Sequence, residues 1–288
     1  MSRILIIGVG LIGGSLARAL KRVHYCDEIV GYGRNHFQLQ RAVELGVVDR
    51  FETNLMDAVQ GVDLIVVAVP LGSMFEVFHR LAELVDAGTV ITDVGSAKGS
   101  VTQAARTAFG DVKFPFFVPG HPVAGTENSG VDASFAELYD QRRVLLTPVV
   151  ETDPAAVQQV ELMWRAAGAV VEMLAVDHHD DVLAATSHLP HILAYTLVDV
   201  LVKMDDSEEI FRYAAGGFRD FTRIASSDPQ MWTDIVMGNK AAILPALDQY
   251  IEHVTQLRAT INRSDENALT ATFSRAKAAR DRYSGKES

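Results

Sequence analysis

Short apolar runs alternate with amphipathic segments through the first half of the chain. The runs include RILIIG at 3–8, DLIVVAVP at 63–70 and TVITDVG at 89–95. An uninterrupted apolar run of this length, bounded by turn residues, is typical of a strand that is buried on both faces. The segments 11–23 and 72–85 instead repeat apolar residues every three or four positions, as an amphipathic helix does. This alternation predicts a parallel β-sheet with crossover helices.

The pattern changes after about residue 174. Further apolar runs come before this point, at 28–33, 116–120, 142–148 and 169–174. After it, long helical patterns follow without a convincing strand, at 182–204, 228–261 and 265–282. A chain of 288 residues is also longer than one core usually organises. We therefore expect an α/β domain with a parallel sheet, residues 1–174, followed by an all-helical domain, residues 175–288.

Composition narrows the class of partner. The net charge of −11 disfavours nucleic acid or an anionic membrane as the main partner, although a locally basic site could still hold an anionic substrate. No apolar run approaches the roughly 20 residues that a membrane-spanning helix needs. The single cysteine, Cys26, excludes an internal disulfide, and the N-terminus has no signal-peptide pattern. We expect a cytoplasmic protein that acts on a small molecule.

A glycine motif follows the first predicted strand and opens the first predicted helix. The sequence there is Gly8-Val-Gly10-Leu11-Ile12-Gly13. In this context the first glycine permits a tight turn, the second lets the backbone approach a pyrophosphate, and the third allows close helix packing. The N–H groups at the helix start then face the anion. A glycine-rich turn without a ligand is the alternative, and we favour a dinucleotide site formed by these residues.

The end of the second predicted strand bears on the choice of cofactor. An NAD site usually places a carboxylate there for the ribose 2′-hydroxyl. The corresponding position holds Gly33, and Arg34 follows it. A missing carboxylate removes repulsion against a 2′-phosphate, and a guanidinium can pair with that group. We expect NADP as the cofactor, with NAD as the alternative, unless Arg34 is only a solvated surface charge.

Three further segments should lie at the carboxyl ends of strands, where an open parallel sheet binds ligands. Val69 follows one strand, and Ser96 and Lys98 lie at a helix start after the next. The stretch GHPVAGTENSG at 120–130 follows a third strand, and its composition predicts a turn. His121 and Glu127 in this turn are able to exchange protons near neutral pH. We assign Val69 and Ser96 to the cofactor site and expect His121 near the nicotinamide.

The helical half contributes two candidate substrate-binding segments. In SHLPH at 187–191, Ser187 and His191 are four residues apart and could share one helix face. The spacing H-x-x-H brings no third ligand with it, so we expect no metal. In GGFRDFTRIASSDPQMW at 216–232, Arg219 and Arg223 are four apart, and an arginine holds a carboxylate in a bidentate fork. We interpret HHDD at 178–181 as a solvated helix start.

Together these motifs resemble the prephenate and arogenate dehydrogenases of tyrosine biosynthesis. The resemblance covers about residues 3 to 260 and rests on five stretches in the family's order: GVGLIGGSLA, TDVGSAKG, GHPVAGTENSG, SHLPH and GGFRDFTRIASSDPQMW. The third and fifth are specific to this family, whereas the glycine motif is shared by many dehydrogenases. The resemblance implies a Rossmann-type domain, followed by a helical domain through which the protein forms a homodimer.

The resemblance also implies a reaction. It is the oxidative decarboxylation of prephenate to 4-hydroxyphenylpyruvate, with hydride transfer to a nicotinamide. His121 resembles the family's acceptor of the hydroxyl proton, and Ser96 the serine between nicotinamide, histidine and substrate. The positions that match substrate-contacting residues of the family are Arg223, His191, Ser187 and Glu127. We expect Arg219 to be structural.

Other functions remain as alternatives. The substrate could be arogenate, which would give tyrosine directly, or both substrates could be used. A β-hydroxyacid dehydrogenase or imine reductase would share the two-domain plan, but those enzymes usually rely on a lysine or aspartate in the helical domain. A redox sensor that binds NADP without turnover would keep the glycine motif and would not need both His121 and Arg223.

Overall fold

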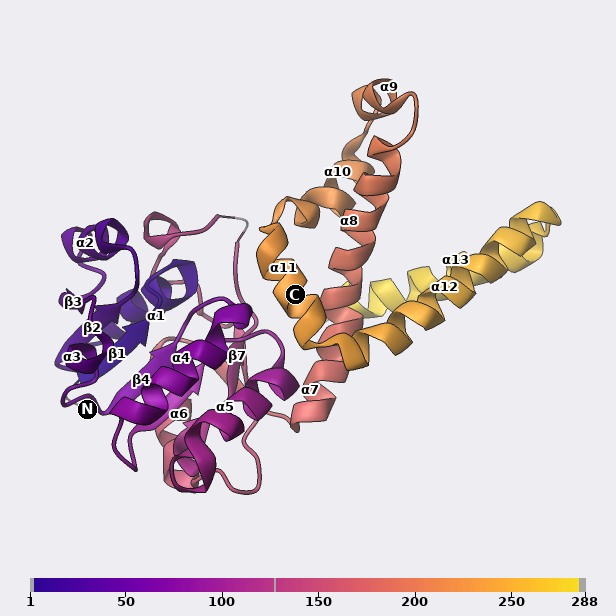
Figure 1. The fold of residues 1–288 in the computed structure, drawn as a ribbon. Helices are drawn as coiled ribbons and strands as arrows, with labels where there is room; N and C mark the ends of the chain where they lie inside the picture. Colours follow the sequence, from indigo (N-terminus) through magenta and orange to yellow (C-terminus); the bar gives the residue numbers. More distant parts are fainter. Residues whose placement is uncertain (1–2, 127, 285–288) are drawn as a thin grey trace. The chain divides into compact units, whose positions relative to one another are not determined.

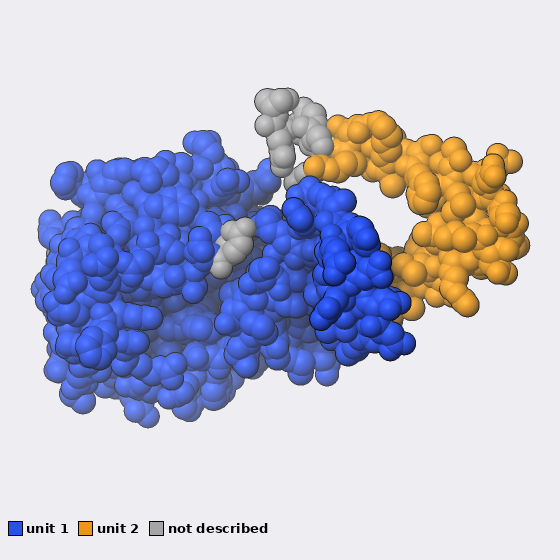
Figure 2. All heavy atoms as spheres, turned by 90° about the horizontal axis from the view of Figure 1, so that it is seen from above, with its two compact units in different colours: residues 1–240 blue, residues 241–288 orange. Residues whose placement is uncertain are grey.

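The structure is a computed structural model that describes residues 3–126 and 128–284 (Figure 1). Glu127, one of the predicted substrate-binding residues, lies outside this part. The chain forms two compact units, residues 1–240 and residues 241–288 (Figure 2). The predicted domain boundary between residues 174 and 175 stays a prediction.

A six-stranded parallel sheet is the centre of the first unit. Its strand order is β3-β2-β1-β4-β5-β6, with every neighbouring pair parallel. The strands are β1 (Arg3–Ile7), β2 (Glu28–Tyr32), β3 (Arg50–Glu52), β4 (Leu64–Val67), β5 (Val90–Asp93) and β6 (Phe117–Val118). The apolar runs predicted five of these strands. They missed β3, whose sequence RFE contains a single apolar residue.

Helices cover both faces of this sheet (Figure 1). Because side chains alternate along a strand, Ile4 and Ile6 of β1 point into one core while Leu5 and Ile7 point into the other. The first core is completed by α1 (Leu11–Arg22) and α6 (Pro154–Ala166), and the second by α4 (Leu71–Leu84) and α5 (Lys98–Lys113). Two short helices flank β3, namely α2 (His36–Glu44) and α3 (Leu55–Ala58). The predicted alternation of strands and crossover helices is confirmed.

The last apolar runs form a separate three-stranded sheet. It has the order β7-β8-β9, with β7 (Gly120–Pro122) antiparallel to β8 (Arg143–Leu146), and β8 parallel to β9 (Val170–Met173). Strand β6 ends before Pro119, which has no N–H to donate to a ladder. The next N–H, that of Gly120, bonds to Asp93 Oδ1 at 3.1 Å. The chain therefore leaves the parallel sheet at Pro119 and begins a second sheet.

Helices after residue 175 complete the first unit. They are α7 (Val176–Leu183), a π-helical turn (Ala184–His188), α8 (Leu189–Val202), α9 (Ser207–Arg212), α10 (Gly216–Thr222), a 3-10 turn (Arg223–Ser226) and α11 (Pro229–Gly238). Helix α11 packs against α4, where the Gly72 N–H donates to Asp234 Oδ2 at 3.2 Å. Helix α7 packs against α5. The helical segments therefore lie directly on the helices that follow β4 and β5.

Two long helices account for the described part of the second unit. They are α12 (Lys240–Asn262), whose first residue belongs to the first unit, and α13 (Glu266–Ser284). The predicted helix over 228–261 is thus divided, because α11 ends at Gly238 and α12 begins at Lys240. None of the helices in the described residues is long and apolar enough to cross a membrane.

Candidate active site

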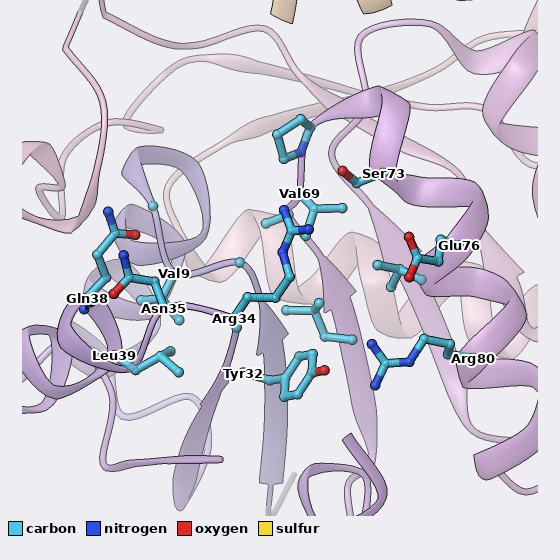
Figure 3. A pocket seen from close by; sticks show the side chains of 17 residues that line it. Val9, Tyr32, Arg34, Asn35, Gln38, Leu39, Val69, Ser73, Glu76 and Arg80 are labelled. Carbon is cyan, nitrogen blue, oxygen red and sulfur yellow. Dashed lines mark hydrogen bonds between the residues drawn. The ribbon is translucent and has the colours of Figure 1, made fainter. Parts of the chain in front are cut away.

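A cavity of about 320 Å³ opens at the carboxyl ends of β1, β2 and β4. This is where the strand order reverses, between β1 and β4, and ligands of open α/β sheets bind at such a point. Figure 3 shows the side chains around it. The cavity is lined by Ile7, Gly8, Val9, Gly10, Tyr32, Gly33, Arg34, Asn35, Gln38, Leu39, Ala68, Val69, Pro70, Ser73, Glu76, Val77 and Arg80.

The glycine motif shapes the inner wall of the cavity. Gly8 has φ +95°, and a Cβ there would lie 2.4 Å from the Ala68 carbonyl oxygen, so no other residue fits without a shift of the backbone. A Cβ on Gly13 would meet the Gly8 oxygen at 2.3 Å. Gly10 faces open space and precedes α1 without a side-chain cap. The free N–H groups of the first turn of α1 can therefore receive a pyrophosphate.

Not every predicted cofactor residue lines this cavity. Gly8, Gly10, Gly33, Arg34 and Val69 do. Four others do not: Leu11 and Ile12 pack against the core, Gly13 packs on Gly8, and Ser96 lies beyond β5. The Ile12 carbonyl accepts a hydrogen bond from the buried Tyr139 hydroxyl at 2.6 Å. The binding roles of all these residues stay predictions.

The outer wall has three polar side chains that were not predicted, those of Ser73, Glu76 and Arg80. Arg34 is exposed, and in Figure 3 its side chain extends between the two walls, with Glu76 and Arg80 on α4 opposite. Ser73, Glu76 and Arg80 are spaced three and four apart, which places them on one face of α4. That spacing was the available signal. Asn35 has a structural role as well, because its side chain caps α2 by accepting from Gln38 N at 3.2 Å.

His121 lies in a strand, so the prediction of a turn was wrong for residues 120–122. It pairs with Leu145 of β8 and is 7% exposed. Its Nδ1 lies 2.9 Å from His179 Nε2. Burial lowers the pKa of His121 well below its ordinary value, and the positive charges that His179, Lys98 and His188 carry when protonated act in the same direction. His121 is therefore a neutral imidazole with one nitrogen able to accept a proton.

The interpretation of HHDD as a solvated helix start was wrong for its two central residues, whereas His178 and Asp181 are exposed. His179 is fully buried and Asp180 is 8% exposed. His179 Nδ1 lies 2.8 Å from Asp180 Oδ1, and the N–H groups of Lys98 and Gly99 each donate to the Asp180 carboxylate at 2.8 Å. Burial opposes ionisation, but these hydrogen bonds keep the pKa of Asp180 below its ordinary value. The signal was the helical spacing that puts residues 179 and 180 on the same face as the buried Leu183.

A buried ion pair between Lys98 and Asp93 contacts the strand that carries His121. Lys98 Nζ lies 2.5 Å from Asp93 Oδ2, and neither side chain is exposed. Lys98 Nζ also donates to the Gly120 carbonyl at 2.7 Å. Burial lowers the pKa of Lys98, while the charges of Asp93 and Asp180 raise it. The pair thus links the end of β5, the start of α5 and the strand that carries His121. The half-buried Ser96 lies between the two paired residues in the sequence.

The SHLPH segment contributes two further histidines. His191 Nδ1 lies 2.8 Å from the Ser187 carbonyl, and the ring stacks on Trp232 with centroids 3.6 Å apart. The two predicted residues are thus brought together, through a backbone oxygen of the π-helical turn. Burial lowers the pKa of His191, the Ser187 carbonyl opposes this, and the charge of Arg223 lowers it further. Trp232 was not predicted.

His188 lies deeper and is 1% exposed. The Asn239 side-chain amide contacts His188 Nδ1 at 3.0 Å and donates to the Asp180 carbonyl at 2.9 Å. Burial lowers the pKa of His188 to about 4. His188 is therefore neutral at physiological pH. Asn239, the residue between α11 and α12, was not predicted, because nothing in its local sequence indicates this contact.

The two arginines of the GGFRDFTRIA stretch are exposed. Arg219 lies in α10 and Arg223 begins the 3-10 turn that follows. The effect of Arg223 on His191 shows that its charge reaches the SHLPH segment, which supports the choice of Arg223 over Arg219. Within residues 3–126 and 128–284, no cluster of three His, Cys, Asp or Glu side chains could hold a metal ion.

The chain matches known proteins along nearly its whole length. Residues 16–173 match the family described as prephenate dehydrogenase, nucleotide-binding domain, and residues 175–275 match prephenate dehydrogenase, dimerization domain. A cyclohexadienyl dehydrogenase from Zymomonas mobilis is 39% identical over 96% of this chain and 94% of that protein. A prephenate dehydrogenase from Bacillus subtilis is 36% identical over 96% of this chain and 75% of that protein.

A solved structure agrees with the sequence relatives. Prephenate dehydrogenase from Aquifex aeolicus, in complex with hydroxyphenyl propionate and NAD+, has a TM-score of 0.91 at 37% identity, covering 97% of each chain. The sequence relatives and the structural relative thus indicate the same family, and the predicted resemblance is confirmed. This chain belongs to the prephenate dehydrogenase family.

Proposed function

We propose that this chain catalyses the oxidative decarboxylation of prephenate to 4-hydroxyphenylpyruvate in tyrosine biosynthesis. The family supports the reaction class, and its relatives include prephenate dehydrogenases. The observation that carries the proposal is the buried His121, whose pKa is lowered by burial, in the strand that follows the carboxyl end of β6, at the same end of the sheet as the cavity. A neutral imidazole in this position can take the proton of a substrate hydroxyl.

The chemistry requires little more than alignment and a proton acceptor. The cofactor, when bound, accepts the hydride that leaves ring C4. His121 takes the proton of the 4-hydroxyl as that oxygen becomes a carbonyl. Loss of CO₂ then makes the ring aromatic, and the oxygen recovers the proton to give a phenol. Atoms and charge balance with one substrate and one oxidised nicotinamide consumed. Because aromatisation supplies driving force, positioning and charge complementarity account for the remaining work of the protein.

We assign the substrate contacts to residues around this histidine. Ser96, between β5 and α5, is proposed to orient the imidazole and the substrate hydroxyl. Arg223 is proposed to bind a substrate carboxylate, and Ser187 and His191 to contact the substrate side chain. The Arg223 side chain is exposed, and its charge acts on His191. The ring of His191 is already oriented by its stacking on Trp232 and by the Ser187 carbonyl.

For the cofactor, we propose NADP rather than NAD. A nicotinamide dinucleotide is supported by the family's nucleotide-binding domain. The A. aeolicus relative was solved with NAD+, so the preference for NADP rests on this chain's own cavity. Gly33 and Arg34 follow the end of β2, and Arg80 adds a second guanidinium to the cavity. Glu76 is the acidic residue among the described residues that line it. The side chains of Arg34, Arg80 and Glu76 together carry a net charge of +1, which favours a 2′-phosphate.

Arogenate is a second candidate substrate. The Z. mobilis relative is named a cyclohexadienyl dehydrogenase, which favours use of more than one cyclohexadiene. Turnover of both compounds, followed through the absorbance of the reduced nicotinamide with NAD and NADP in separate reactions, tests the reaction, the substrate and the cofactor. We expect reduction with prephenate and a higher kcat/KM with NADP. Absence of reduction with either substrate would contradict the enzyme assignment, and a tenfold or greater preference for NAD would contradict the cofactor assignment.

We also propose that the chain forms a homodimer through the helices after residue 175. The matched family domain is described as a dimerization domain. Apolar side chains are exposed on α8, including Val200 and Val202, and separately on α12 and α13, including Ile251, Val254 and Phe273. Surfaces of this kind mark protein interfaces. Light scattering coupled to gel filtration should give twice the 31.4 kDa mass of one chain, and a single-chain mass would contradict the proposal.

A further inference from the structure

A chain of hydrogen bonds joins Asp180 to His121 through His179. Asp180 Oδ1 lies 2.8 Å from His179 Nδ1, and His179 Nε2 lies 2.9 Å from His121 Nδ1. His179 is fully buried, and the other two groups are 7% and 8% exposed. The three side chains come from two elements, β7 and α7, which lie far apart in the sequence.

The position of each proton in this series of hydrogen bonds follows from the Asp180 carboxylate at one end of it. Asp180 already accepts the backbone N–H groups of Lys98 and Gly99, so its carboxylate is held ionised and can only accept. His179 must then carry its proton on Nδ1, facing Asp180. With this one proton on His179, its Nε2 is bare and can only accept from its neighbour. His121 must therefore carry its own proton on Nδ1, which leaves Nε2 as the acceptor.

We propose that His179 and Asp180 are positioning residues that hold His121 in the tautomer whose Nε2 is free to take the substrate proton. This inference rests on the proposed function of His121. Without these two hydrogen bonds, either nitrogen of His121 could carry the proton, and one of the two tautomers has no acceptor facing the substrate. The Asp180 carboxylate also contributes a negative charge. Through His179, this charge stabilises the imidazolium that forms when His121 takes the substrate proton.

Substitutions of His179 separate this role from a purely structural one. In a side chain at this position, the amide of Asn takes the place of Nδ1 and the amide of Gln takes the place of Nε2. Gln can therefore accept from His121 but has no atom in the place of Nδ1, whereas Asn can donate to Asp180 but cannot reach His121, and Leu bonds to neither. We expect His179→Gln to keep kcat within about tenfold of the wild type. We expect His179→Asn and His179→Leu to lose about 100-fold or more in kcat, with the KM for prephenate changed less than about threefold.

Thermal unfolding of each variant controls for loss of structure. If the Leu variant fails to fold, the comparison of Gln with Asn decides the question, because the two side chains are both polar amides. The proposal is overturned if Asn or Leu keeps wild-type kcat, or if Gln loses as much turnover as Leu. A uniform rise in KM with unchanged kcat would likewise overturn it, because that pattern would mean that His179 serves substrate binding.

A spectroscopic measurement tests the tautomer without turnover. In the full-length protein labelled with ¹⁵N-histidine, we expect His121 to show a protonated Nδ1 and a bare Nε2 near neutral pH. In His179→Leu we expect a mixture of the two tautomers. A bare Nδ1 in the wild type would overturn the proposal. Failure of the proposed function would show instead as absence of wild-type turnover, with this tautomer still present.

Discussion

The cavity proposed to hold the dinucleotide and the histidine cluster are opposite kinds of structure. The cavity is open and is lined by glycine backbone and by exposed side chains such as Arg34 and Arg80. The cluster is buried, and each of His121, His179 and Asp180 is hydrogen-bonded to another polar group. A binding surface of the first kind tolerates exchange of single side chains. A proton acceptor needs the second kind, because the position of each hydrogen matters.

The same contrast holds for ion pairs. The Lys98–Asp93 pair has no exposed surface, whereas in the Arg106–Glu151 pair, 2.8 Å long, the side chains are 40% and 43% exposed. A surface ion pair contributes little to the free energy of unfolding, because water screens the two charges and the side chains lose conformational freedom when they pair. A buried pair contributes little net stability either, yet removing one partner is costly because the other charge remains buried.

The largest effect should come from removing the buried lysine. Lys98→Met leaves the Asp93 carboxylate buried without its cation, so the free energy of unfolding should fall by about 3–5 kcal/mol. Urea denaturation measures this loss. Arg106→Ala is the control at the exposed pair and should leave the free energy of unfolding nearly unchanged. Equal effects of the two substitutions would remove the contrast between the pairs.

The next largest effect should come from the proton acceptor itself. Asn at position 121 can reproduce the contact of Nδ1 with His179 but has no atom in the place of Nε2. We expect His121→Asn to lower kcat by about 100-fold or more, the usual loss when a general base is removed. Stopped-flow and steady-state assays of nicotinamide reduction measure it. Wild-type turnover in this variant would exclude His121 from the mechanism.

Local patterns predicted the parts of this molecule that local rules govern. The apolar runs predicted β1, β2, β4 and β5 because strands buried on both faces need such runs. The glycine motif was recognisable because Gly8 must adopt positive φ beside a backbone oxygen. Strand β3 escaped because only one of its three residues is apolar.

The buried cluster could not be predicted in the same way. His121 and His179 are 58 positions apart, and their contact exists only because α7 packs on α5. A histidine in a polar run resembles a surface residue until tertiary packing buries it. The sequence therefore suggested His121 through its family motif but assigned His179 and Asp180 to solvent. Polar side chains on the apolar face of a predicted helix are the signal to examine in such cases.

At the substrate end, Arg223 and Arg219 form a matched pair. Both are exposed and they lie four residues apart, but the charge of Arg223 reaches His191. Arg223→Ala should raise the KM for prephenate by about 20-fold, the scale of one charge-assisted hydrogen bond, with kcat nearly unchanged. Arg219→Ala should leave both constants within about twofold of the wild type. A larger effect of Arg219 would reverse the assignment.

At the cofactor end we expect a smaller effect, because the contact is exposed and solvated. Arg34→Ala should raise the KM for NADP by about tenfold and leave that for NAD within about twofold, since only NADP carries the 2′-phosphate. The ratio of kcat/KM for the two cofactors is the measurement. The control is Arg143→Ala, an exposed arginine paired with Glu172 in the second sheet. An unchanged ratio in the Arg34 variant would contradict the proposed contact.

The smallest effect tests whether burial keeps His188 neutral. The pKa of His188 is about 4 in the folded chain against 6.5 ordinarily, so below pH 6.5 the unfolded chain binds more protons. Stability should thus be full above that pH and decline as pH falls, by about 1 kcal/mol from this residue between about pH 6.5 and about pH 5.5. His188→Asn keeps an acceptor for the Asn239 amide and does not titrate, so urea unfolding at the two pH values should show that decline reduced by about 1 kcal/mol. His178→Asn, an exposed position on α7, should leave the decline unchanged. If both substitutions have the same effect, burial of His188 does not govern the acid sensitivity of the fold.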